Sequence, residues 1–402
     1  MPGTGHGAAY YAERNMIDRL PLAPCPVTDW SDERRTAVLR ATRWGHRWGR
    51  FGWLRRALVW SALVLVAVLT LYGQYWLHDV APERERLAHT RPDLHQVFGA
   101  AELADRATAV VDLVGLGNLD ATDTARSLPA LAALGQVWAV QYDNAGLDTA
   151  VISRMIVAHA EQAGVERIVL VGHSMGGILA LEVAEHVVAD PDLDLLAVIL
   201  DCTPIDLHAV RAEARDAGED LLRWMGWLPG ARESRTLRLL VEVAARRDRY
   251  LLSHRHRLPT VDPGALTEAV TDVLRDKIFS RRAASNGLIE AQFRAIVASG
   301  ALDHLGALAV RRGERSAPAV VFLRPRRGTD DEVVDVDYTQ TVLFDRIGGP
   351  QGQLRVVRLT GTGHANPIQQ PQAYNAAVAT KVVPFLDRLA GQDERPVLAG
   401  GR

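Results

Sequence analysis

The sequence predicts an α/β fold, in which a mainly parallel sheet is covered by helices on both faces. Two patterns support this prediction. Short apolar runs, such as residues 167–171 and 195–200, alternate with longer segments of helical periodicity. A Gly-x-Ser-x-Gly pentapeptide at residues 172–176 joins one apolar run directly to a helical segment. The chain has 402 residues, enough for one large domain with extensions or for two modest domains.

Charge and cysteine content exclude several classes of function. The formal net charge is −2, which gives no overall bias toward nucleic acid, so we expect no nucleic-acid partner. Cys25 and Cys202 are too few and too far apart for a disulfide framework or a metal cluster. His254 and His256 have no Cys or carboxylate at ligand spacing. We therefore expect no metal site and no cofactor.

Residues 57–77 form an uncharged apolar segment that is long enough to cross a membrane. About 20 helical residues at ~1.5 Å each cover the ~30 Å hydrocarbon core. Aromatic residues gather near its two ends, as in interfacial belts: Trp53, Trp60, Tyr72, Tyr75 and Trp76. The alternative, a buried helix of the globular domain, fits this aromatic pattern less well. We predict one transmembrane helix, with the membrane as a partner.

Arginines determine the predicted orientation of this helix. Six arginines lie between Arg40 and Arg56 on the amino-terminal side, whereas residues 79–86 on the other side carry charges of both signs. Positive flanks stay cytoplasmic, so residues 1–56 are expected inside and everything after Leu77 outside the cell membrane. A cleaved signal peptide fits less well, because the stretch before the apolar run is too long and no Ala-x-Ala-like site follows it.

The predicted cytoplasmic segment has two parts. Residues 1–30 are rich in Gly, Pro and polar residues and are expected to be flexible. Ser31 can cap a helix that runs to about Arg50, with acidic residues in its first turn. Its arginines, with Trp44 and Trp48, would suit a membrane surface. A solvated basic stretch that only secures the topology is an equal alternative.

The elements of the α/β domain follow a polar connector at residues 78–106. The expected strands are residues 107–114, 136–142, 167–171, 195–200, 319–323 and 354–359. The expected helices are residues 147–164, 176–189 and about 372–389. Sites in such sheets lie beyond the carboxyl ends of the strands, so the loops after these strands should meet at one edge.

The pentapeptide Gly172-His173-Ser174-Met175-Gly176 lies between an expected strand and an expected helix. A Gly-x-Ser-x-Gly sequence in this context forms a nucleophile elbow, a sharp turn that holds the serine hydroxyl out at the top of a sheet. Glycines are needed there because a larger side chain would collide with the neighbouring strand or helix. The sequence therefore predicts Ser174 as a nucleophile.

With these motifs the chain resembles the α/β-hydrolase family over roughly residues 107–389, in the order Ser…Asp…His. The resemblance implies Ser174 as nucleophile and His364, after strand 354–359, as catalytic histidine. The acid should follow strand 319–323, where the Gly-x-x-Asp-x-x-Val spacing selects Asp331. Four alternatives remain: Asp330 and Asp335 nearby, and more remotely Asp201 or Asp206, because some members carry the acid one strand earlier.

The resemblance also implies the roles of these groups. Histidine takes the serine proton near neutral pH, and the carboxylate fixes the imidazole tautomer. The family supplies two backbone donors to the oxyanion, here the N–H groups of Met175 and Leu116. Family members often have His-Gly in the second loop, whereas this chain has Val114-Gly115, which still leaves a backbone donor.

A long insertion separates two of the expected strands. Residues 203–315 are too many for a simple connection and contain segments of helical pattern, and in the family such insertions form a helical cap. One hypothesis is that an apolar group in the insertion lines the substrate pocket or faces the membrane: Trp224, Met225, Trp227 and Leu228. The alternative is that these residues pack the cap onto the core.

The sequence thus predicts six segments. They are a cytoplasmic segment (1–56), a transmembrane helix (57–77), a connector (78–106), a core (107–202 and 316–392), a cap (203–315) and a flexible tail (393–402). The predicted function is a membrane-anchored serine hydrolase that cleaves a small-molecule or lipid ester or thioester. A non-hydrolytic acyltransferase or lyase on the same fold, or a catalytically silent scaffold, are the alternatives, and the oligomeric state stays open.

Overall fold

The computed structural model describes residues 32–41, 52–254, 257–280, 282–309, 317–348 and 353–393. The chain divides into two units, Met1–Tyr75 and Trp76–Arg402, which we describe separately. The expected flexible segment at residues 1–30, the helix cap Ser31, the tryptophans Trp44 and Trp48, and the tail from residue 394 onward lie outside the described residues.

The first unit contains two described helices. Helix α2, Asp32–Ala41, starts with Asp32 and Glu33 in its first turn. Helix α4, Trp53–Tyr75, has 23 residues and none of them is buried. The helical segment Trp53–Ala88 has a mean hydropathy of 1.9 over its most apolar window, and among the described residues it is the one helix long and apolar enough to cross a membrane. This length and composition agree with the apolar segment found in the sequence.

The second unit is built on a seven-stranded sheet with the order β1-β3-β2-β4-β5-β8-β9. All neighbouring pairs are parallel except β1 with β3. The strands are β1 (Asp93–Phe98), β2 (Thr108–Leu113), β3 (Gln136–Gln141), β4 (Arg167–His173), β5 (Asp194–Asp201), β8 (Ala319–Pro325) and β9 (Leu354–Leu359). The prediction of a mainly parallel sheet is confirmed.

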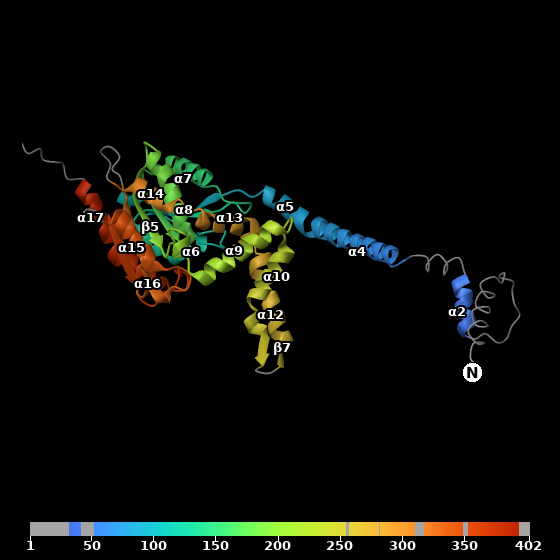
Figure 1. The fold of residues 1–402 in the computed structure, drawn as a ribbon. Helices are drawn as coiled ribbons and strands as arrows, with labels where there is room; N and C mark the ends of the chain where they lie inside the picture. The colour runs from blue at the N-terminus through green and yellow to red at the C-terminus, as the bar shows by residue number, and fades with distance from the viewer. Residues whose placement is uncertain are drawn as a thin grey trace, which may run out of the picture. The chain divides into compact units, whose positions relative to one another are not determined.

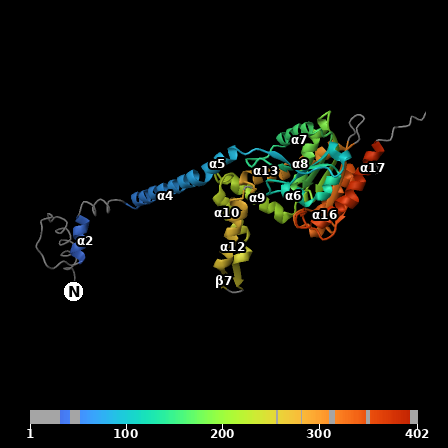
Figure 2. The same ribbon diagram turned by 180° about the vertical axis from the view of Figure 1, so that it is seen from behind.

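Helices cover the sheet because its central strands are apolar on both faces. All residues of β2 and β8 are buried. Along the chain, α7 (Thr149–Ala163) packs on α8 (Met175–Ala189), α8 on α14 (Ala301–Leu308), and α14 on α15 (Val336–Ile347). A second group, α16 (Pro371–Ala377), η7 (Val378–Val382) and η3 (Pro129–Ala133), packs together, and α17 (Val383–Asp393) continues from η7. Figures 1 and 2 show these helices around the sheet.

Strand β1 lies in the segment 78–106, where the sequence predicts a connector and not a strand of the sheet. Only Leu94 of its residues is buried, and it pairs with β3 at the edge of the sheet. Helix α5, Ala81–Ala88, precedes it in the same segment. An edge strand with polar residues such as His95 and Gln96 lacks the continuous apolar run by which the central strands were identified.

The insertion between β5 and β8 is mainly helical but also contains a hairpin. Its helices are η4 (Leu207–Ala209), α9 (Ala212–Trp227), α10 (Arg235–Ala245), α11 (Arg247–Tyr250), α12 (Pro263–Val273), η5 (Leu274–Ile278), α13 (Asn286–Val297) and α14. Strands β6 (Leu251–His254) and β7 (Arg257–Val261) pair antiparallel. Helix α13 packs on α8 and α9, whereas α10, α12 and β7 extend away from the sheet in both views (Figures 1 and 2).

Candidate active site

Ser174 lies in a strained turn between β4 and α8. Its backbone has φ 53° and ψ −123°, a conformation that residues with a side chain rarely adopt. A Cβ atom on Gly172 would lie 2.4 Å from the carbonyl oxygen of Gly176, and one on Gly176 would lie 2.2 Å from that of Leu113. Only glycine fits at either position, so the two glycines allow the sharp turn that presents the serine hydroxyl.

His364 connects Ser174 to Asp331 through hydrogen bonds at its two ring nitrogens. Nε2 lies 2.8 Å from Ser174 Oγ, and Nδ1 lies 3.0 Å from Asp331 Oδ2. The three side chains come from the loops after β4, β8 and β9, at the carboxyl edge of the sheet. The assigned roles follow from chemistry: Nδ1–H donates to the carboxylate, and Nε2 accepts the hydroxyl proton. This arrangement can activate a serine nucleophile.

Asp331 is buried, yet it is held as a carboxylate. Burial alone would raise its pKa, but the hydrogen bond and charge interaction with His364 outweigh burial and lower the pKa. The backbone N–H groups of Val334 and Val333 also donate to Oδ1, at 2.8 and 2.9 Å. Arg211 donates to the backbone oxygen of Asp331 and fixes the loop. The carboxylate is therefore ready to orient the imidazole.

The other four candidate acids have different partners. Asp330 pairs with Arg327, Asp335 caps α15, Asp206 caps η4 and accepts from Tyr338 Oη, and Asp201 pairs with His173. Within the described part of the chain, Asp331 is the acid that hydrogen-bonds to His364. The structure thus brings together the three residues that the sequence placed in the triad.

The two expected backbone donors flank Ser174. Met175 is the first residue of α8, so its N–H has no partner within the helix. The loop that carries Leu116 approaches the turn closely, because a Cβ on Gly115 would lie 3.1 Å from Ser174 Cβ. Both positions are compatible with an oxyanion site near the serine.

Gln292 of α13, which sequence reasoning did not identify, holds the second of these loops. Its Oε1 accepts from Gly117 N–H at 2.9 Å, and its Nε2 donates to the Asn118 oxygen at 2.8 Å. The side chain is fully buried. No motif marks this residue, because its partners are 174 and 175 positions away. Gln292 therefore links the cap directly to the loop that carries Leu116.

A cavity of about 380 Å³ opens beside Ser174 and His364. Most of the other side chains that line it are apolar and come from the insertion and the loops after β2, β8 and β9: Leu116, Val210, Phe293, Ile296, Val333, Val334, Pro367 and Ile368. The cavity can therefore hold an apolar group next to the serine hydroxyl.

The four expected pocket residues lie elsewhere, as far as the structure describes them. Met225 is buried, Leu228 is half-buried, and Trp227 is 79% exposed, and none of these three lines the cavity beside Ser174. The side chain of Trp224 lies outside the described part of the chain. Phe293 and Ile296 of α13 take that position instead. Their apolar spacing is the same as that of any core helix, so the sequence gives no separate signal for them.

A second carboxylate–histidine cluster lies directly beneath the serine. His173 Nδ1 is 2.8 Å from Asp201 Oδ2, and Nε2 is 3.1 Å from Asp112 Oδ1. Burial alone would lower the pKa of His173, but the two carboxylates together raise it to about 10. The hydroxyl of Tyr374 donates to the other oxygen of Asp201, and Ser174 N–H donates to the Asp201 backbone oxygen. The cluster holds a protonated imidazole under the turn.

One group of described residues has metal-ligand spacing, but its chemistry does not suit a metal. Cys202, Asp331 and His364 offer atoms within 4.8 Å of one another. Burial raises the pKa of the Cys202 thiol well above its ordinary value, whereas metal ligation needs the thiolate. Asp331 and His364 already hydrogen-bond to each other. The group is better described as part of the serine site.

One family model matches this chain. A model of the alpha/beta hydrolase family matches residues 87–377. No curated protein matches the sequence. Solved structures of similar fold include a protein assigned as a non-heme bromoperoxidase from Mycobacterium tuberculosis H37Rv (18% identity, 74% of this chain and 96% of that chain covered, TM-score 0.46). A thermophilic esterase from Thermogutta terrifontis is also similar (16% identity, 76% of this chain and 94% of that chain covered, TM-score 0.43). So is a proline iminopeptidase from Mycobacterium smegmatis (16% identity, 76% of this chain and 98% of that chain covered, TM-score 0.43).

Proposed function

The chain belongs to the α/β-hydrolase family, and we propose that it is a membrane-anchored serine hydrolase that cleaves a carboxylic ester or thioester. The observation that carries the proposal is the continuous hydrogen-bonded chain from Ser174 Oγ through His364 to Asp331. A nucleophile, a base and an orienting carboxylate in this geometry serve acyl transfer.

The reaction proceeds in two halves. Ser174 Oγ attacks the acyl carbon while His364 Nε2 takes the hydroxyl proton, and the N–H groups of Met175 and Leu116 stabilise the oxyanion. His364 then gives its proton to the leaving alcohol or thiol, which departs and leaves an acyl-enzyme. Water attacks this acyl group, His364 again accepts a proton, and the carboxylic acid and free serine result. Asp331 stabilises the imidazolium in both halves.

The apolar cavity supports an acyl or apolar alcohol group as the part of the substrate that is bound. Its walls include Val210, Phe293 and Ile296 of the insertion, and Ser174 lines the same cavity. Apolar side chains can desolvate a hydrocarbon group but cannot pair with a buried charge. We therefore expect uncharged acyl chains to be preferred.

Membrane anchoring is supported by α4, which is uncharged and apolar from residue 57 onward and rich in arginine at and before its amino-terminal end. The expected topology puts the hydrolase unit outside the cytoplasm. Two fusions to the carboxyl terminus of the full chain test it: alkaline phosphatase, active only outside, and a fluorescent protein that folds only inside. Phosphatase activity without fluorescence is expected, and fluorescence without phosphatase activity would contradict the orientation.

Hydrolysis by the full chain in a non-ionic detergent tests the activity. p-Nitrophenyl esters of increasing acyl length should be cleaved by the wild type and not by Ser174→Ala. Ser153→Ala is the matched control, because Ser153 lies in α7 and hydrogen-bonds only within its own helix. Incorporation of oxygen from labelled water into the released acid separates hydrolysis from acyl transfer. Equal activity of Ser174→Ala and wild type would refute the proposal.

A further inference from the structure

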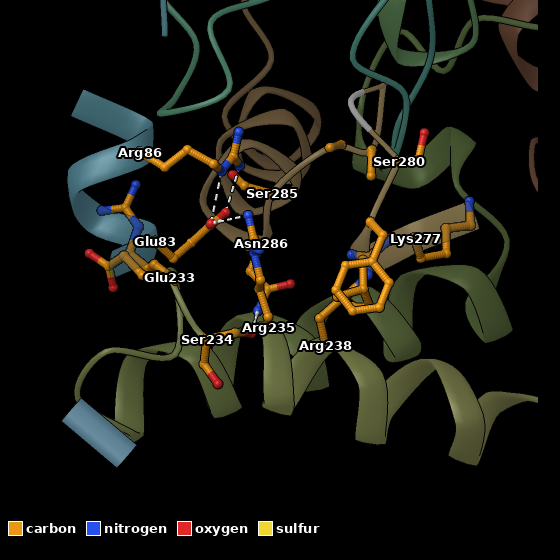
Figure 3. Close-up of a pocket in the computed structure, with 15 residues that line it drawn as sticks. Glu83, Arg86, Glu233, Ser234, Arg235, Arg238, Lys277, Ser280, Ser285 and Asn286 are labelled. Atoms are coloured by element: carbon orange, nitrogen blue, oxygen red, sulfur yellow. Dashed lines mark hydrogen bonds and ion pairs between the residues drawn. The ribbon is translucent and has the colours of Figure 1, made fainter. Parts of the chain in front are cut away.

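A second cavity, of about 150 Å³, lies away from Ser174 where α5 meets α10 and η5 (Figure 3). We call it the cationic cavity, because five positively charged side chains line it: Arg86, Arg232, Arg235, Arg238 and Lys277. Only two carboxylates, Glu83 and Glu233, share the lining. Neither the fold nor the serine site requires such a concentration of cations.

The carboxylates around the cationic cavity do not neutralise it, because three of them are each shared by two arginines. Glu83 pairs with Arg86 and Arg235, Glu242 with Arg238 and Arg246, and Glu290 with Arg232 and Arg294. Each group of three keeps one net positive charge. Glu83 and Glu290 are almost fully buried, so water screens these charges weakly. Glu233 pairs one-to-one with Arg84, which does not line the cavity.

Two of the lining cations have unused hydrogen-bonding capacity. The ammonium group of Lys277 has no hydrogen bond or ion pair with any described residue, although its charge helps to lower the pKa of Glu242 and Asp276. Arg238 has a buried Nε atom without a hydrogen-bond partner, although its terminal nitrogen pairs with Glu242. Burial and repulsion from Arg246 hold the pKa of Arg238 below its ordinary value despite Glu242. An anion in the cavity would accept from these donors and relieve the repulsion.

The position of the cationic cavity along the chain favours a lipid as the source of this anion. Glu83 and Arg86 lie six and nine residues after Leu77, the expected end of the membrane span, or ~9 and ~14 Å along a helix at ~1.5 Å per residue. The headgroup region adds ~5–8 Å on each side of the hydrocarbon core, so along the chain these residues follow directly after it, and their long side chains extend the reach of the cavity toward headgroup phosphates. Arg84 stacks over Trp76 with 5.0 Å to the ring centroid. Phe279, 70% exposed, adds an apolar surface to the lining, as an amphipathic ligand requires.

We propose that the cationic cavity binds the phosphate group of an anionic phospholipid. Phosphate offers several acceptor oxygens to arginine and lysine donors, and an anionic headgroup brings no cation of its own. A zwitterionic headgroup carries an ammonium group that the surplus positive charge would repel. The site itself rests on the cavity residues alone, whereas the lipid source rests on the proposed membrane anchoring.

The experiment uses the full chain in a non-ionic detergent. Short-chain phosphatidylglycerol, phosphatidylcholine of the same acyl length, and inorganic phosphate are titrated separately, with binding followed by native mass spectrometry and microscale thermophoresis. Lys277→Gln and Arg238→Gln remove one cation each, and Glu242 keeps Arg246 as a partner in the second variant. Lys381→Gln is a matched control, because Lys381 is the only other lysine in the chain and is exposed beside β9. Thermal unfolding verifies that each variant is folded.

We expect phosphatidylglycerol to bind roughly tenfold more tightly than phosphatidylcholine, and each cavity variant to weaken that binding by roughly three- to tenfold. Lys381→Gln should leave it unchanged, and inorganic phosphate should compete with the lipid. If the cavity variants weaken the binding of inorganic phosphate but the wild type shows no preference between the two lipids, the anion site is supported and a lipid as the source of the anion is refuted. Equal binding by wild type, Lys277→Gln and Arg238→Gln would overturn the site itself.

Discussion

Two histidines adjoin Ser174, and each contacts carboxylates, but their surroundings differ. His364 has a side chain 20% exposed to solvent and faces one carboxylate, Asp331, and the serine hydroxyl. His173 has a side chain 4% exposed and faces two carboxylates, Asp112 and Asp201. For His173, the two carboxylates outweigh burial and raise the pKa. The raised pKa of His173 keeps it protonated, whereas His364 has the serine hydroxyl at its second ring nitrogen, as the proposed base requires.

The protonated His173 has a structural consequence. Its two carboxylates come from β2 and β5, the strands on either side of β4, so the cluster connects three neighbouring strands at their carboxyl ends. Asp201 also accepts from Tyr374 of α16. A buried ion pair adds little net stability over an apolar core, but removal of one partner leaves an uncompensated buried charge. We therefore expect the cluster to hold the turn at Ser174 in place.

The largest effect should come from the carboxylate of the solvent-accessible histidine. Asp331→Asn should lower kcat by roughly 10⁴-fold, because an amide fixes the wrong imidazole tautomer. Asp330→Asn, one residue away and paired with Arg327, should change kcat less than about twofold, since a surface pair contributes little. Ester hydrolysis at saturating substrate measures both. A larger loss in Asp330→Asn than in Asp331→Asn would reverse the assignment.

The next largest effect should be on stability and come from the buried cluster. Asp201→Asn should lower the free energy of unfolding by about 3 kcal/mol, because His173 loses one of its two compensating charges. Asp194→Asn, at the other end of β5, is the control and should change it by less than about 0.5 kcal/mol. Urea unfolding measures the difference. A stable Asp201→Asn protein would show that the cluster is dispensable for folding.

The pH dependence of stability separates the two histidines further. The pKa of His173 in the folded chain is about 10, above the ordinary value of 6.5. A raised pKa means that the folded state binds the proton more tightly than the unfolded state does. The contribution of protonated His173 to the free energy of unfolding is therefore fully present below pH 6.5. It is lost as the pH rises through about 10. Unfolding free energies from pH 6 to 10.5 should fall for the wild type and fall less steeply for His173→Gln; parallel curves would contradict the protonated assignment.

The smallest effect should come from the hydroxyl that supports Asp201. Tyr374→Phe removes the hydrogen bond to Asp201 and the one that Tyr374 Oη accepts from Asn366 N–H. The expected loss of unfolding free energy is about 1–2 kcal/mol, because the buried Asp201 loses a donor and the half-buried Asn366 N–H loses an acceptor. Tyr250→Phe, in the cap, is the control. A loss of activity without a loss of stability would place Tyr374 with His364 instead.

The sequence predicted the elements with strong local patterns. The apolar runs of β2, β4 and β8 and the glycines around Ser174 are each readable from a few neighbouring residues. The family order of Ser, Asp and His then selected three residues that the structure brings into hydrogen-bond contact. Local periodicity was sufficient there because the carboxyl ends of parallel strands must share one edge.

Other features depend on pairings that no local pattern contains. Asp112 lies inside an apolar run, and its neighbour His173 is identified only through the parallel pairing of β2 with β4. His173 and Asp201 are register partners in β4 and β5. The cationic cavity combines residues from α5, α10 and η5, separated by long stretches of chain. The cap hairpin and the polar edge strand β1 also lack a strong apolar signal.

The central claim is that His364, and not His173, activates Ser174. Covalent labelling of the full chain by a fluorophosphonate tests it most directly, with the rate compared among wild type, His364→Ala and His173→Gln at equal folded concentration. We expect labelling of the wild type, loss of at least roughly 10³-fold in His364→Ala, and only a modest change in folded His173→Gln. Undiminished labelling in His364→Ala, or its loss in folded His173→Gln alone, would contradict the claim.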